Sequence, residues 1–94
     1  MFRTALAFLA LASTPALAGH YQARPSGLPA VARFVAKDVV WKCGDGGCTA
    51  GKSNSRPALV CAALVRQVGR VDSFTAGGET LPADQLEKCN SRAR

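Results

Sequence analysis

The sequence contains few of the side chains on which catalysis and metal binding usually depend. His20 is the single histidine among 94 residues, and no serine stands in the Gly-x-Ser-x-Gly pattern of a nucleophile elbow. The six acidic residues fall in expected turns and at expected helix starts, where capping and solvation account for them. We therefore predict that the protein is not an enzyme, and that it has no cofactor and no metal site.

Aromatic residues are also scarce, at 6% of the chain, and no two Lys or Arg residues are adjacent. The 12 Lys and Arg residues nevertheless exceed the 6 Asp and Glu residues, which gives a net charge of +6. A nucleic-acid surface combines a basic patch with aromatic rings that stack on bases. We expect no nucleic-acid partner, and instead a basic face that attracts anionic polymers or lipid head groups of the cell envelope. The residues expected on this face are Arg56, Arg66, Arg70, Arg92 and Arg94.

No apolar run reaches the roughly 18 residues of a membrane span. Arg3, the uncharged apolar run 4–12, Pro15 and the small residues of Ala16-Leu17-Ala18 instead follow the order of a cleavable signal peptide. We predict that residues 1–18 direct export and are removed, with the cut after Ala18 or one residue later, after Gly19. No cysteine precedes Cys43, so the cleavage site offers no thiol for lipid attachment. The mature protein is expected to be periplasmic or secreted, without a transmembrane segment.

Alternating apolar and polar residues predict three hairpins in the mature chain. Residues 33–36 and 39–43 flank Lys37-Asp38, and residues 71–76 and 79–81 flank Gly77-Gly78. Residues 39–43 also pair with 48–50 through a four-residue loop, 44–47, which places Trp41 on the inner face, in the core.

Two helices complete the prediction. An apolar stripe predicts a helix over 57–68, with Ser55 as its N-cap and Gly69 at its end, and Pro82 opens a second helix that continues to Asn90. The fold class is therefore α+β, a small antiparallel meander of hairpins with two helices on one face. Residues 31–94 form this single domain, and residues 19–30 are expected to be an extended or disordered lead-in.

The four cysteines include no Cys-x-x-Cys pair, which argues against a zinc knuckle and against a thioredoxin-like motif. Small exported domains usually rely on disulfides, and four cysteines allow three connectivities. The predicted hairpin register places Cys43 opposite Cys48, and Cys61 and Cys89 lie on the inner faces of the two predicted helices. We predict the disulfides Cys43–Cys48 and Cys61–Cys89, which staple the domain. The alternative is a metal- or thiol-dependent protein that uses Cys43 and Cys48 on the Gly-rich loop.

Residues 46–53 match the Walker A pattern, in which backbone amides cradle phosphates. That motif requires a parallel sheet and a helix that starts at the lysine. Pro57 stands only five residues after Lys52, and an exported protein meets little nucleotide. We interpret the match as a chance one.

Several segments together resemble a functionally uncharacterised family of short exported alphaproteobacterial proteins with four cysteines. The segments share the pattern W-K-C-G-x-x-x-C, R-P-A-x-x-C and K-C-N, at residues 41–48, 56–61 and 88–90. The resemblance implies no activity, substrate or cofactor. In such proteins we expect an Asn-Gly turn where this chain has Lys37-Asp38. The sequence thus predicts a small exported, disulfide-stabilised protein that serves as a non-catalytic accessory or binding module.

Overall fold

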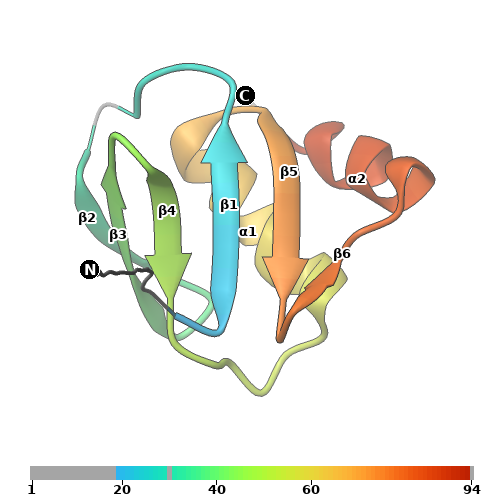
Figure 1. Ribbon diagram of the computed structural model, residues 1–94, viewed down its shortest axis with the longest axis horizontal. Helices are drawn as coiled ribbons and strands as arrows, with labels where there is room; N and C mark the ends of the chain where they lie inside the picture. The colour runs from blue at the N-terminus through green and yellow to red at the C-terminus, as the bar shows by residue number, and fades with distance from the viewer. Residues whose placement is uncertain (1–18, 30, 94) are drawn as a thin grey trace, which may run out of the picture.

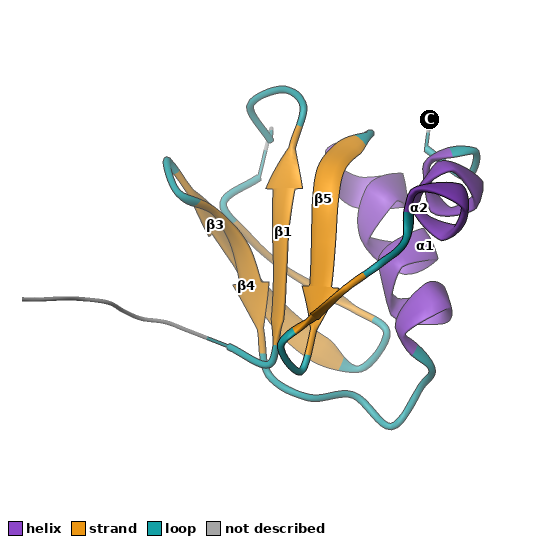
Figure 2. Ribbon diagram, turned by 45° about the vertical axis from the view of Figure 1, so that its right-hand side comes forward, coloured by secondary structure: helices purple, strands orange, loops and turns teal. Residues whose placement is uncertain are grey.

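The protein forms one six-stranded antiparallel sheet with two helices against one face (Figures 1 and 2), in a computed structural model that describes residues 19–29 and 31–93. In chain order the elements are β1 (Tyr21–Pro25), β2 (Arg33–Ala36), β3 (Val39–Gly44), β4 (Gly47–Ala50), α1 (Pro57–Val68), β5 (Val71–Ala76), β6 (Glu79–Thr80) and α2 (Ala83–Asn90). The α+β class is confirmed. The predicted signal peptide, residues 1–18, lies outside the described residues.

The strand order is β2-β3-β4-β1-β5-β6, so β1 lies inside the sheet between β4 and β5. Residues 21–25 of the expected lead-in are therefore extended and form a strand inside the sheet, so the folded part includes a segment that the prediction placed before its start at residue 31. Tyr21 and Ala23 are buried whereas Gln22 and Arg24 are exposed, which is the period-two pattern of a strand with one face on the core. The pattern covers only five residues and ends at Pro25. Because the following residues favour turns, the sequence did not indicate a strand here.

The position of β1 also corrects the predicted meander. Both β4 and β5 pair antiparallel with β1, so they run in the same direction and α1 crosses over β1 to connect them. The three predicted hairpins are confirmed around this central strand, β2–β3, β3–β4 and β5–β6.

The β3–β4 hairpin has the predicted register, with Cys43 opposite Cys48, but a shorter loop. Gly44 pairs with Gly47, so the turn contains two residues, Asp45 and Gly46, instead of four. Gly47 has a φ of 116°, and a Cβ there would collide with the carbonyl oxygen of Ala23 on the neighbouring strand. A glycine is required at this position, and it lets the ladder continue to the end of the hairpin.

The core lies between the sheet and α1. Trp41, Tyr21 and Phe74 come from three strands and are almost completely buried, with ring centroids 5.8–6.3 Å apart. The core position of Trp41 is confirmed. The apolar stripe of α1 packs against the same layer, and its fully buried members are Val60, Cys61, Leu64 and Val65.

Helix α1 has the predicted bounds but not the predicted N-cap. Arg56 is the N-cap residue and makes no side-chain capping hydrogen bond, while Pro57 supplies the first turn with its fixed φ. Ser55 lies one residue before the N-cap, and its backbone N–H donates to the Ser53 hydroxyl at 3.0 Å. At the other end Gly69 has a φ of 83° and its N–H donates to Val65, as a C-terminal glycine cap does.

Candidate binding groove between the two helices

The structure contains two disulfide bonds, and they involve all four cysteines. Cys43–Cys48 links β3 to β4 with Cα atoms 4.0 Å apart, and Cys61–Cys89 links α1 to α2 with Cα atoms 5.9 Å apart. The alternative site at Cys43 and Cys48 is therefore without free thiols. Within residues 19–29 and 31–93 no three His, Cys, Asp or Glu side chains are grouped so that they could hold a metal ion.

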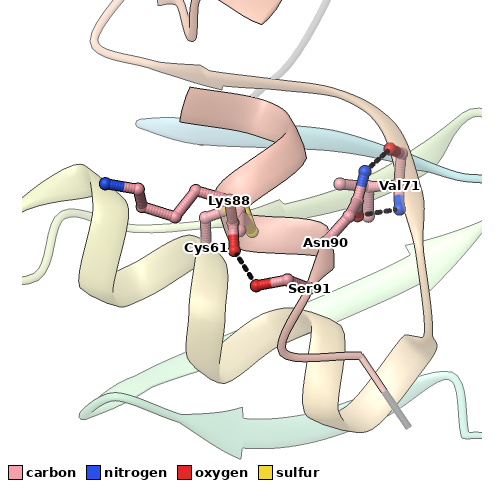
Figure 3. The surroundings of a disulfide bond; sticks show 6 residues. Cys61, Val71, Lys88, Asn90 and Ser91 are labelled. Carbon is pink, nitrogen blue, oxygen red and sulfur yellow. Dashed lines mark hydrogen bonds between the residues drawn. A yellow bond between two sulfur atoms is a disulfide. The ribbon is translucent and has the colours of Figure 1, made fainter. Parts of the chain in front are cut away.

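The Cys61–Cys89 bond and one neighbouring side chain fix α2 against the rest of the domain (Figure 3). The Asn90 side chain is buried and binds both backbone groups of Val71, at the start of β5. Its Oδ1 accepts from the Val71 N–H at 2.8 Å, and its Nδ2 donates to the Val71 carbonyl at 2.9 Å. This role of Asn90 did not follow from the sequence pattern. The one hint was its position, because a polar residue directly after an inward-facing cysteine near the end of a helix can also face inward.

An open groove of about 630 Å³ lies between α1, α2 and the β2–β3 turn. Its floor is apolar and consists of small side chains together with Leu59. Helix α1 contributes residues four apart, which lie on the same side of the helix. The floor residues are Ala58, Leu59, Ala62, Ala63 and Cys89. Cys89 is one half of the inter-helix disulfide, so the groove borders that bond.

Positive side chains from three elements surround this floor. Lys37 comes from the β2–β3 turn, Arg66 from α1, and Lys88 and Arg92 from the end of α2 and the residues after it. Lys88 and Arg92 are four residues apart, and the chain stays helical enough after Asn90 to bring them to the same side. Among the described residues Asp84 is the single acidic one that lines the groove, so this part of the lining carries three net positive charges. We call Lys37, Arg66, Lys88 and Arg92 the cationic rim.

The predicted basic face is only partly gathered at this groove. Arg66 and Arg92 line it, whereas Arg56 lines an adjoining hollow of about 740 Å³ with Leu81 and Pro82. Arg70 lies 3.7 Å from Glu87 in an exposed ion pair. Arg94 lies outside the described residues.

Two members of the cationic rim were missed by the sequence analysis. Lys88 could have been found from its spacing of four residues from Arg92. Lys37 gave no such signal, because the fold alone brings the β2–β3 turn beside α1.

The segment that matches the Walker A pattern has a structural role. Its strand, β4, is antiparallel to both neighbours, and α1 begins five residues after Lys52. Ser53 is buried, and its backbone N–H and carbonyl lie 3.2 and 3.3 Å from the Tyr21 hydroxyl. These contacts hold the β4–α1 loop over the aromatic core.

No helix in the described part of the chain has the length and hydrophobicity needed to cross a membrane. No curated protein and no solved structure is detectably similar to this chain. Residues 5–91 match the sequence model of a family of unknown function, DUF8200, and the chain belongs to that family.

Proposed function

We propose that this protein is an exported, non-catalytic accessory module that binds anionic components of the cell envelope through the cationic rim. The observation that carries the proposal is the convergence of Lys37, Arg66, Lys88 and Arg92 on one groove. These four residues come from separate parts of the chain, and the fold places them around a common space. Phosphate or carboxylate groups are the complementary chemistry.

Two observations support export to the periplasm or the medium. The first 18 residues have the charge, apolar run and small residues of a signal peptide, in the order that processing requires. The two disulfides belong to a domain of a size that often needs them, and such bonds persist in oxidising compartments. Both point to a location where envelope lipids and polymers are the abundant anions.

The strength of such binding follows from exposure. Ion pairs in water contribute about 0.2–1 kcal/mol each, so four of them support weak association that depends on several contacts at once. Salt should reduce this association, because the Debye length falls from roughly 30 Å at 0.01 M ionic strength to about 8 Å at 0.15 M. Salt sensitivity is therefore the first property to measure.

Binding can be tested with the protein recovered after export, with both disulfides intact. Sedimentation with phosphatidylglycerol vesicles, with phosphatidylcholine vesicles and with a soluble anionic polysaccharide separates lipid from polymer as the source of the anion. Arg66→Gln with Arg92→Gln removes half of the cationic rim. Arg56→Gln with Arg70→Gln removes the same charge outside the groove.

We expect the rim variant to lose about fivefold or more in affinity for the anionic partner, and the control less than about twofold. Equal losses in the two variants, or binding that is indifferent to salt, would show that the positive charge is only a solvated surface.

Export has its own test, the intact mass of the protein after secretion. A product that begins at Gly19 or at His20 supports the proposal, and a product that begins at Met1 contradicts it.

A further inference from the structure

The floor of the groove has chemistry that anion binding does not use. A site for a simple anion needs positive and hydrogen-bonding groups, yet this floor is lined by alanine and leucine side chains. Leu59 is 46% exposed there, which leaves a large apolar side chain in water. An occupant with both an apolar part and an anionic part would satisfy the floor and the rim together.

We infer that the groove binds a single-chain anionic amphiphile, whose acyl chain lies along the floor and whose head group is held by the cationic rim. The inference rests on the proposed function and specifies its ligand class. Ala58 and Ala62 are one helical turn apart on α1, so their short side chains leave space along the helix for a chain. Leu59 and the Cys89 side chain add further apolar contacts.

The size of the groove suits a single chain. Two helices and a turn flank its floor, so an acyl chain can lie between them. Its volume of about 630 Å³ lies within the range of roughly 300–1,000 Å³ that small-molecule sites occupy. A lipid molecule released from the bilayer, with one acyl chain, fits this space.

Charge complementarity selects the head group. Four positive side chains and one carboxylate line the groove, so a head group with net negative charge is favoured over a zwitterionic one. Arg66 and Arg92 present planar guanidinium groups, which can bind two oxygens of one phosphate or carboxylate. A lysophospholipid with a glycerol phosphate head is a suitable probe.

Calorimetry should compare three probes below their critical micelle concentrations. Decanoyl lysophosphatidylglycerol has both parts, decanoyl lysophosphatidylcholine has the chain with a zwitterionic head, and glycerol phosphate has the head alone. We expect the first to bind about tenfold or more tightly than either of the others. Each added methylene should raise affinity about twofold to fourfold, because only part of the chain leaves water in an open groove. In NMR spectra the methyl signals of Ala58, Ala62 and Ala63 should shift.

The floor can be filled without changing its charge. Ala62→Leu occupies the space for the chain, and Ala83→Leu adds the same side chain at an exposed helical position outside the groove. We expect Ala62→Leu to weaken lysophosphatidylglycerol binding about tenfold and to leave binding to anionic vesicles or polysaccharide within about twofold. Ala83→Leu should alter neither. Circular dichroism of both variants checks that the fold is intact.

The possible failures are distinguishable. If glycerol phosphate binds as tightly as lysophosphatidylglycerol, the acyl chain does not use the floor. The same follows if Ala62→Leu has no effect on lysophosphatidylglycerol binding. In either case this inference is wrong while anion binding stands. If lysophosphatidylcholine binds as tightly as lysophosphatidylglycerol, the rim does not select the head group and the inference is also wrong. If the Arg66 and Arg92 variant binds every anionic partner normally, the proposed function itself fails.

Discussion

The two disulfides stabilise two regions, the β3–β4 hairpin and the pair of helices, and these regions depend on their disulfides to different degrees. Cys43–Cys48 joins adjacent strands, at a sequence separation of 5, and the ladder of β3 and β4 already pairs these residues. Cys61–Cys89 joins two helices at a sequence separation of 28, with a hairpin between them. The first bond reinforces a contact that local structure makes, and the second supports a contact that only the tertiary fold makes.

The chain-entropy model gives this difference a magnitude. In that model the loop closed by Cys43–Cys48 adds about 2 kcal/mol to the free energy of unfolding, and the longer loop closed by Cys61–Cys89 adds about 3.5 kcal/mol. Cys89 of the longer bond also forms part of the groove floor, whereas neither cysteine of the shorter bond lines the groove. Stability and ligand binding should therefore be linked in the helical region and separate in the hairpin.

Replacing Cys61 and Cys89 with serine should have the largest effect. We expect the free energy of unfolding to fall by about 3–4 kcal/mol, because the loop constraint is lost and two buried positions become polar. Binding of the anionic ligand should fall with it, since α2 supplies Lys88 and Cys89 to the groove. Urea titration and calorimetry measure the two quantities. A variant that keeps full ligand affinity would show that the bond does not position the groove.

The second prediction concerns Asn90, which holds α2 to β5 without a covalent bond. Asn90→Ala removes both hydrogen bonds to Val71 and leaves buried backbone groups without their partner. We expect a loss of about 2–3 kcal/mol. Ser91→Ala is the control, because its hydroxyl bonds the Lys88 carbonyl at an exposed position and its loss should amount to less than about 1 kcal/mol. Equal effects of the two variants in urea titration would contradict the role assigned to Asn90.

Replacing Cys43 and Cys48 with serine should have a smaller effect, about 2 kcal/mol. The β3–β4 ladder and the buried Trp41 remain in the variant, so the hairpin should keep its register. Affinity for the anionic ligand should stay within about twofold of the native value at a temperature where the variant is folded. A larger loss of affinity than in the Cys61 and Cys89 variant would reverse the comparison between the two regions.

The two regions also differ in how far the sequence predicted them. Residues 39–50 encode their register through alternation and glycine placement, so Cys43 opposite Cys48 followed from local pattern. The bounds of α1 followed from its apolar stripe, Pro57 and Gly69. The place of β1 in the sheet did not follow, because its five residues carry no information about which strands they join.

The candidate site was the least predictable part of the molecule. Arg66 and Arg92 were expected on a basic face because helical periodicity places them. Lys37 lies at the same groove as Arg66 and Arg92 only because the β2–β3 turn packs beside α1, and no local sequence pattern predicts that packing. Asn90 depends in the same way on the start of β5.

The smallest expected effect lies in the β2–β3 turn, which belongs to the hairpin region. Lys37 and Asp38 have φ values of 53° and 68°, in the left-handed region that a two-residue hairpin turn of this type requires. Glycine is preferred at the second of these positions, and an L-residue in this region costs roughly 1–2 kcal/mol, less for Asp. Asp38→Gly should therefore stabilise the protein by about 0.5–1 kcal/mol, after allowance for the greater freedom of glycine in the unfolded chain. Asp45→Gly is the matched control, because Asp45 lies in the two-residue β3–β4 turn and is not among the residues with positive φ. The midpoint of urea denaturation should rise for Asp38→Gly and stay level or fall for Asp45→Gly; a rise of the same size in both would mean that backbone strain in the first turn is not the cause.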